Sequence, residues 1–318
     1  MNNKYYSPDS VSFWKHYLVH MRPYLWFVSG FAGMVGAFVS LEQFNHRFLL
    51  AIIPFFLSYG FGQALTDCFQ IDTDKLSAPY RPLSKGIIAK EHVLYVSVIG
   101  LIICGIILVY LNTYNTLFAI ISIIGLATYS FTKKRFWFLG PPHNSLIVAM
   151  LPIMGFLSFS KTPVKLVFEE ISSIALVVFL AYNVFVLMGY LKDITADKQA
   201  GYRTFTVVWG WDMTTFLCDI LYVWVFCLIL IEGWLNGLNW IYFLAAVLMA
   251  ISGQFMAHFQ KTKSEEFAFF PIIQSVRSFL LICYTLIYNY SPDIFWYLIL
   301  VHILFEITLF LRPEKKQI

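Results

Sequence analysis

Charged residues are scarce in this chain. Asp, Glu, Lys and Arg make up 13% of its 318 residues, roughly half of their share in an ordinary soluble domain. Hydrophobic residues reach 59%, and the mean hydropathy is +0.71. This composition excludes a soluble globular protein, and the long apolar runs predict an all-α protein whose helices cross a membrane several times.

Other familiar sequence patterns are also missing. The five cysteines show neither the spacing of a zinc site nor a pairing pattern, so we interpret them as small core residues. A signal-peptide pattern is lacking, because residues 2–15 are polar and the first apolar run is long. No linker or low-complexity segment divides the chain, so we expect one domain over residues 1–318. Nothing indicates a nucleic-acid module or a protein partner.

Ten apolar runs are long enough to cross a bilayer. They cover residues 23–41, 47–66, 92–112, 115–131, 143–160, 170–191, 213–232, 238–259, 268–290 and 294–311. Most of the 22 Lys and Arg residues fall in alternate connections, together with the two terminal segments. Because such residues concentrate on the cytoplasmic side, this bias predicts a multi-pass protein with both termini and the loops 67–91 and 192–212 in the cytoplasm.

These two loops concentrate acidic residues beside hydrocarbon, where carboxylates are costly and usually functional. The polar side chains of the first loop are spaced i, i+3 and i+7, and those of the second i and i+4, so each set is expected on one face of a helix. They are Asp67, Gln70 and Asp74 in the first loop, and Asp193 and Asp197 in the second. Each loop also ends in a turn that contains Arg, a weak internal repeat that suggests two half-sites facing one cavity.

Basic residues flank both acidic sets. Carboxylates bind Mg²⁺, Mg²⁺ bridges phosphate oxygens, and Lys and Arg neutralise the remaining charge. The pattern therefore predicts an enzyme that handles a lipid diphosphate at the membrane surface. The basic residues expected to bind the diphosphate from these loops are Arg81, Lys192, Lys198 and Arg203.

In these motifs the chain resembles the UbiA family of intramembrane prenyltransferases. The family's Asn-Asp-x-x-Asp-x-x-x-Asp signature and its later Arg-Pro-Leu fall on residues 66–74 and 81–83, and its Asp-x-x-x-Asp falls on residues 193–197. Arg22, before the first span, and a Tyr-x-x-x-Lys element at Tyr129 and Lys133, in the family's loop between spans four and five, also fit. The resemblance covers about residues 20–290 and implies a nine-span core, to which residues 294–311 are expected to add a tenth span.

The resemblance implies a Mg²⁺-dependent enzyme that binds a polyprenyl diphosphate and ionises it to an allylic cation, which alkylates a small and usually aromatic acceptor. The catalytic residues implied are Asp67, Asp74, Asp193 and Asp197, which also bind the metal together with Gln70. Arg22 and Lys133 join the diphosphate-binding set. Metal and basic side chains would stabilise the departing diphosphate, while a pocket among the helices keeps water from the cation.

The chain departs from the family pattern in three places. Gln70 replaces a central Asp, Thr66 replaces an Asn, and the tenth span is additional; Asp72 is a candidate replacement for the lost charge. These departures leave open a membrane terpene cyclase, which closes the same cation on its own double bonds without an acceptor. A transporter or lipid scaffold is a third class, disfavoured because the acids lie at one interface and not in mid-span.

Five further residues are candidate substrate contacts. They are Asp72, Tyr129, Asn144, Asn183 and Arg277. For Arg277 the alternative is that its side chain extends to the interface, and for the two asparagines it is helix–helix hydrogen bonding. His302 and Glu306, spaced i and i+4, are interpreted as a helix-surface pair. The expected partners are thus the bilayer, a polyprenyl diphosphate and a small acceptor.

Overall fold

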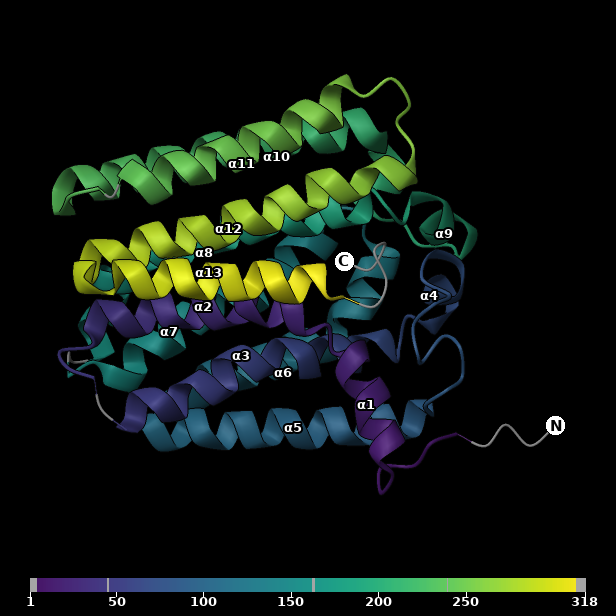
Figure 1. Cartoon of the computed structure of the whole chain (residues 1–318), viewed down its shortest axis with the longest axis horizontal. Coiled ribbons are helices and arrows are strands. Elements are labelled where there is room, and N and C mark those ends of the chain that lie inside the picture. The colour runs from purple at the N-terminus through teal and green to yellow at the C-terminus, as the bar shows by residue number, and fades with distance from the viewer. Residues whose placement is uncertain (1–4, 45, 162–163, 239, 313–318) are drawn as a thin grey trace.

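The computed structural model describes residues 5–44, 46–161, 164–238 and 240–312. Within these ranges ten helices are long and apolar enough to cross a membrane. They lie roughly side by side as a bundle, and the short helices gather at one of its ends (Figure 1). The predicted all-α, ten-span architecture is therefore confirmed.

Each predicted span corresponds to one of these helices. They are α2 (Trp26–Ser40, preceded by η1, Pro23–Leu25), α3 (His46–Asp67), α5 (Lys90–Leu111), α6 (Asn115–Arg135), α7 (Gly140–Phe159), α8 (Val164–Tyr190), α10 (Phe205–Asn236), α11 (Trp240–Phe259), α12 (Phe269–Tyr290, preceded by η2, Glu265–Ala268) and α13 (Phe295–Phe310, preceded by η3, Pro292–Ile294). One predicted start is wrong, because α10 begins at Phe205 and not near residue 213. Gly210, with a φ of +77°, kinks that helix, and the apolar run that the sequence shows is the part beyond the kink.

Three short helices lie at the same end of the bundle: α1 (Val11–His20), α4 (Ile71–Ser77) and α9 (Ile194–Gln199). The last two come from the two acidic loops, and they contact each other. The Ser10 side chain caps the start of α1. Between α1 and α2 the chain turns sharply at Arg22, whose φ of 54° is left-handed, and Pro23 then starts η1. This turn brings the N-terminal segment over the end of the bundle that carries both acidic loops.

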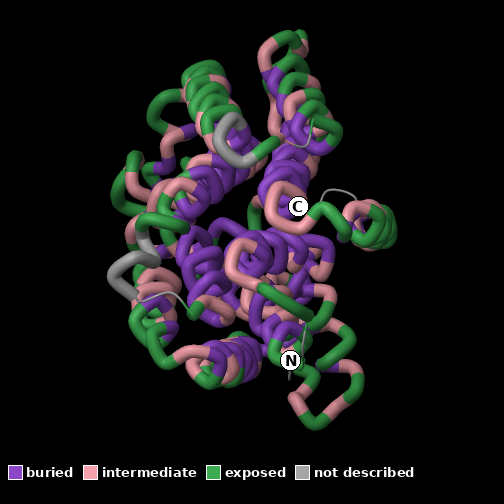
Figure 2. The backbone as a smooth tube through the Cα atoms, turned by 90° about the vertical axis from the view of Figure 1, so that its left-hand side faces the viewer, coloured by how far each residue is buried: buried purple, intermediate pink, exposed green. Residues whose placement is uncertain are grey.

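The most buried helices are α2, α7, α8 and α12, whereas α5, α6 and α13 expose much of their surface. Figure 2 shows the buried backbone inside and the exposed backbone around it. Glycines allow α2 and α7 to approach closely, since a Cβ on Gly36 would lie 1.7 Å from the carbonyl oxygen of Pro152. Close packing through small residues is how membrane helices associate without a hydrophobic driving force. It fixes α2 in the centre, next to the acidic loops.

Candidate active site

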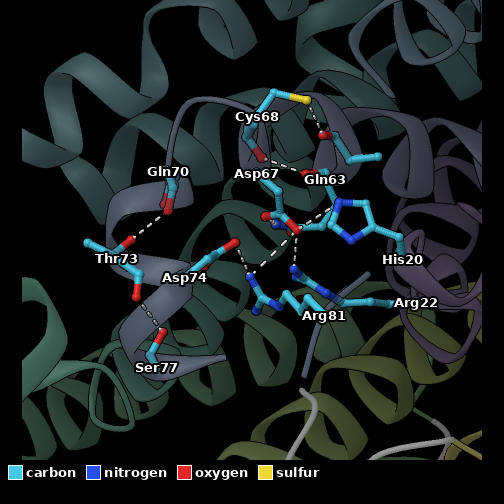
Figure 3. Close-up of polar contacts among 12 residues, drawn as sticks. His20, Arg22, Gln63, Asp67, Cys68, Gln70, Thr73, Asp74, Ser77 and Arg81 are labelled. Carbon is cyan, nitrogen blue, oxygen red and sulfur yellow. Dashed lines mark hydrogen bonds and ion pairs between the residues drawn. The ribbon is translucent and has the colours of Figure 1, made fainter. Parts of the chain in front are cut away.

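Asp67, the last residue of α3, is a buried carboxylate that several donor side chains surround (Figure 3). Its Oδ2 lies 2.5 Å from Nη2 of Arg22, and its Oδ1 accepts a hydrogen bond of 2.9 Å from Nε2 of Gln63. Nη1 of Arg81 and Nε2 of His20 each lie 3.6 Å from Oδ2. Burial lowers the pKa of His20 to about 4 although Asp67 opposes the shift, so this imidazole is neutral. Nitrogen atoms of Arg22, Gln63 and Arg81 thus surround the carboxylate of Asp67.

Arg81 joins the two carboxylates of the first acidic loop. Its Nη1 lies 2.6 Å from Oδ2 of Asp74, in addition to its longer approach to Asp67. Burial raises the pKa of Asp74, and the positive charge of Arg81 opposes that rise. One guanidinium therefore contacts carboxylates from both α3 and α4, as the dashed lines from Arg81 in Figure 3 show.

The expected single helical face for this loop is wrong. The α-helix α3 ends at Asp67, residues 68–70 form a tight turn, and α4 begins at Ile71. In the turn the Gln70 amide donates to the Asp67 carbonyl, and the Asp74 amide then donates to the Gln70 carbonyl as α4 starts. The two carboxylates meet because both contact Arg81, a tertiary interaction that spacing along a helix does not contain.

The second acidic loop is built around Lys133 of α6. Its Nζ lies 3.5 Å from Oδ1 of Asp197 and 5.1 and 5.3 Å from the ring centres of Tyr190 and Tyr202. Burial raises the pKa of Asp197 to about 6, opposed by the neighbouring ammonium. Asp193, at the start of α9, lines the cavity described below. Lys133 thus lies on the last turns of α6, and not in the loop where the family resemblance places the Tyr-x-x-x-Lys element.

Gln70 connects the two acidic loops. Its Oε1 accepts a hydrogen bond of 3.2 Å from Nζ of Lys133, and its Nε2 donates one of 3.1 Å to Oγ of Ser130. The same lysine reaches Asp197 of the second loop. Lys133 of α6 therefore links Gln70 of the first acidic loop to Asp197 of the second. The expected arrangement of two half-sites around one cavity stays a prediction.

A deep cavity extends from these polar groups into the bundle, between α2, α3, α5, α6, α7 and α8. Near its mouth it is walled by aromatic residues, among them Tyr59, Tyr129, Tyr182, Phe185 and Tyr190. Farther in it is lined by aliphatic side chains and ends near Leu108, Ala119 and Met154. Along α6, the 14-residue separation of Lys133 and Ala119 corresponds to about 21 Å. The cavity thus joins a charged mouth to a long apolar interior.

Most of the side chains expected from the sequence lie at this mouth. Those that line the cavity are Arg22, Asp67, Gln70, Asp74, Arg81, Tyr129, Lys133, Asn144, Lys192 and Asp193. Asp197 does not line it and lies behind Lys133. Burial lowers the pKa of Lys192 to about 8, while the nearby Asp193 opposes the shift. Four carboxylates and four basic side chains therefore meet within one small region.

Five expected residues lie elsewhere. Asp72 faces away from the cavity, paired with Lys134 at 3.2 Å. Lys198 and Arg203 are exposed, and Asn183 is buried in α8 outside the cavity lining. Arg277 is not a cavity residue either.

Arg277 instead forms two contacts of 2.6 Å with the carboxylate of Glu306 on α13. The expected pair of His302 and Glu306 is present at 3.7 Å. The dominant partner of Glu306 is nevertheless the arginine. Sequence spacing missed this pair, because the helices α12 and α13 bring the two residues together.

Sequence reasoning also missed His20, Gln63 and Tyr190. Gln63 lies four residues before Asp67 on α3, so it shares the face of that helix. Tyr190 lies three residues before Asp193, and its hydroxyl is 3.1 Å from that of Tyr129. His20 is fully buried two residues before Arg22. The helical spacing of Gln63 was a usable signal, whereas nothing in the sequence indicates the positions of the other two.

The donor atoms at the mouth suit a hard cation. They are carboxylate and amide oxygens, which Mg²⁺ prefers, and both carboxylate oxygens of the buried Asp197 lack a hydrogen-bond partner among the described residues. In the described ranges no three His, Cys, Asp or Glu side chains form a ready-made cation cage. Arg22 and Arg81 contact the Oδ2 atoms of Asp67 and Asp74 in the first loop. The residues therefore fit Mg²⁺ by chemistry, and in the first loop the metal would share these carboxylates with the two arginines.

Comparison with known proteins places this arrangement in a family. The UbiA prenyltransferase family matches residues 25–281, which include both acidic loops and the cavity. The chain belongs to the UbiA prenyltransferase family. It is therefore a multi-pass membrane prenyltransferase, and the family match ends within α12, before α13.

Relatives of this UbiA-family chain include a digeranylgeranylglyceryl phosphate synthase of Pyrococcus horikoshii. That protein is 25% identical over 198 residues, which cover 62% of this chain and 69% of the relative. A synthase of the same name from Methanococcoides burtonii is 28% identical over 214 residues, covering 62% and 72%. The product in this name carries a phosphorylated glycerol and not an aromatic ring.

Solved structures show the same fold. A UbiA homologue from Aeropyrum pernix K1 superposes with a TM-score of 0.68 at 18% identity, covering 80% of this chain and 94% of the other. A homologue from Archaeoglobus fulgidus, bound to DMAPP and Mg²⁺, has a TM-score of 0.62 at 15% identity and covers 84% of this chain and 98% of the other. At these identities the likeness concerns the fold alone.

Proposed function

We propose that this prenyltransferase transfers a polyprenyl group from its diphosphate to a small acceptor and depends on Mg²⁺. The observation that supports the proposal most directly is the convergence of two acidic loops and four basic side chains above one long apolar cavity. Asp67, Asp74, Asp193 and Asp197 would hold the metal, which supplies charge for the departing diphosphate. The Mg²⁺ and prenyl diphosphate bound by a structural relative agree with this assignment.

The basic side chains at the mouth have the complementary task. Arg22, Arg81, Lys133 and Lys192 line it and would neutralise the phosphate oxygens as charge develops on them. Arg22 and Arg81 now contact Asp67 and Asp74, and exchange of these carboxylates for phosphate keeps every buried charge paired. Lys198 and Arg203, being exposed, would serve only at the rim of the site.

The cavity would hold the prenyl chain. Its aliphatic interior removes an isoprenoid from water, and its aromatic upper wall presents ring faces that attract a cation. Because the cavity is about 21 Å deep along α6, we propose a donor of several isoprene units. Enclosure between six helices would also keep water from the allylic cation.

The acceptor is expected to enter beside the aromatic wall. The family resemblance implies an aromatic acceptor, whereas the name of the relatives indicates a phosphorylated glycerol derivative. The basic residues of the described lining are the same four that serve the diphosphate. An acidic group of the acceptor would therefore have to share them.

We further propose that the acidic loops and both termini face the cytoplasm and that residues 1–318 form one domain. The Lys and Arg bias supports the orientation, and ten spans put the two termini on one side.

The test is an assay of the purified protein in detergent with Mg²⁺ and geranyl, farnesyl or geranylgeranyl diphosphate. Each donor is supplied alone, with 4-hydroxybenzoate, or with geranylgeranylglyceryl phosphate. Donor consumption that needs both Mg²⁺ and one acceptor supports the proposal, and the acceptor used identifies the class. Cyclic hydrocarbon formed without an acceptor would establish the cyclase alternative instead. No consumption of any donor under these conditions would contradict the proposal.

A further inference from the structure

Gln70 occupies the position where the family motif has a carboxylate, and its contacts differ from those of a metal ligand. Its Oε1, the one atom of the side chain that binds a cation well, lies 3.2 Å from Nζ of Lys133. An ammonium group only donates, so the atom beside it has to be the amide oxygen. Both side chains are buried, with 8% and 6% of their surface exposed.

The other end of the amide is also fixed. Nε2 of Gln70 donates to Oγ of Ser130, and Ser130 precedes Lys133 by three residues on α6. Residues at this spacing share one face of a helix. Gln70 therefore bridges two neighbouring positions of α6, with a donor against the hydroxyl and an acceptor against the ammonium. Neither a carboxylate nor an apolar side chain supplies both.

Charge explains why an amide suits this position. Nζ of Lys133 already lies 3.5 Å from Asp197 and 5.1 and 5.3 Å from the ring centres of Tyr190 and Tyr202. A carboxylate at residue 70 would add a second negative partner and hold the ammonium more strongly among protein groups. The neutral amide directs Lys133 by a hydrogen bond without neutralising its ammonium group. The positive charge of Lys133 then remains available to an anion in the cavity that this lysine lines.

We propose that Gln70 is a positioning residue that directs Lys133 toward the substrate's diphosphate, and that it is not a Mg²⁺ ligand. This inference rests on the proposed function, because it assigns the diphosphate to the mouth of the cavity. It replaces the ligand role that the spacing of the first loop suggests. Of that loop, the metal would then be held by Asp67 and Asp74 alone.

Gln63 provides a matched contrast. It is also a glutamine of the cavity lining, but its Nε2 donates to Asp67, an expected metal ligand. Replacing Gln63 should therefore disturb metal binding, whereas replacing Gln70 should disturb anion binding. Ser130→Ala removes the second anchor of Gln70 without touching any expected ligand.

The test measures binding by isothermal titration calorimetry on the full-length protein in detergent. Inorganic pyrophosphate is titrated in EDTA, and Mg²⁺ is titrated separately without substrate, with Lys133→Met as the reference for loss of the ammonium. In EDTA we expect Gln70→Leu to weaken pyrophosphate binding about tenfold and Ser130→Ala about threefold, the effect of removing hydrogen bonds that act on a charged group. The Mg²⁺ affinity of both variants should stay within about twofold of the wild type, while Gln63→Leu should lower it.

The opposite pattern would overturn the inference. If Gln70 binds the metal, Gln70→Leu weakens Mg²⁺ binding and leaves pyrophosphate binding in EDTA unchanged. Unfolding midpoints identify any variant that fails to fold, and Gln70→Met then replaces Gln70→Leu with the same expectations. Failure of the proposed function would be detected by a separate measurement, the activity assay. In that case the wild-type protein would consume no prenyl diphosphate in the presence of Mg²⁺ and either acceptor.

Discussion

Arg277 of α12 and Glu306 of α13 form a two-pronged ion pair, in which Nε and Nη2 each lie 2.6 Å from a carboxylate oxygen. Both residues lie within membrane-crossing helices. A charge in such a place is costly unless it is matched. The pair therefore attaches α13, which lies outside the family match, to the core of the bundle.

Breaking this pair should destabilise the protein more than breaking an exposed one. We expect Arg277→Met or Glu306→Gln to cost about 1–3 kcal/mol, because each leaves the opposite group without its partner. The double variant Arg277→Met with Glu306→Met should recover most of the loss. Lys161→Met is the control, since its pair with Glu42 is largely exposed and should contribute less than about 1 kcal/mol. Unfolding midpoints in detergent measure the effect, and equal losses at both pairs would contradict the assignment.

Metal dependence should follow the two acidic loops. Asp67→Ala and Asp193→Ala are each expected to lower turnover by at least about a thousandfold, because charge stabilisation of the leaving group is a large part of catalysis. EDTA should do the same to the wild type, and excess Mg²⁺ should reverse it. Asp72 belongs to the same motif, but its side chain faces away from the cavity. The turnover of Asp72→Asn should therefore stay within about twofold of the wild type. Turnover by Asp67→Ala in the presence of EDTA would exclude the mechanism.

The depth of the cavity should limit the length of the prenyl chain. Gly105 of α5 lines the cavity, and a Cβ built there meets no atom within 4 Å. Gly105→Leu should therefore fill space that a long chain needs, and kcat/KM for geranylgeranyl diphosphate relative to geranyl diphosphate should fall about tenfold, the size of an overpacking penalty. Ile106→Leu, at an exposed neighbouring position, should not change this ratio. A lower kcat/KM for both donors alike would show that the prenyl chain does not reach Gly105.

Orientation in the membrane can be tested with single cysteines in a cysteine-free background. Thr262→Cys lies in the connection between α11 and η2, at the end of the bundle that carries the acidic loops, and Thr113→Cys lies in the turn between α5 and α6 at the other end. In intact cells an impermeant maleimide should label position 113 and not position 262. The reverse pattern would place the acidic loops on the outer face and contradict the orientation proposed from the Lys and Arg bias.

The sequence predicted the bundle well because hydropathy and charge bias depend on the bilayer, which acts on each segment separately. It could not predict the break between α3 and α4, since the turn at residues 68–70 contains neither Gly nor Pro. The meeting of Asp67 and Asp74 depends on Arg81, and the position of Arg277 depends on a carboxylate 29 residues away. Such contacts arise only when helices pack. The motif spacing identified the acidic residues correctly but not which basic side chain each would face.

The balance of acidic and basic groups at the cavity mouth has a consequence for how substrates arrive. Three carboxylates and four basic side chains line the mouth, and Asp197 lies directly behind Lys133. Together these groups have almost no net charge, so their field fades within a short distance. A diphosphate in solution is then not attracted over a long distance, and its close contacts with the basic side chains form only after arrival. Without the metal, the rate of association should therefore hardly respond to ionic strength.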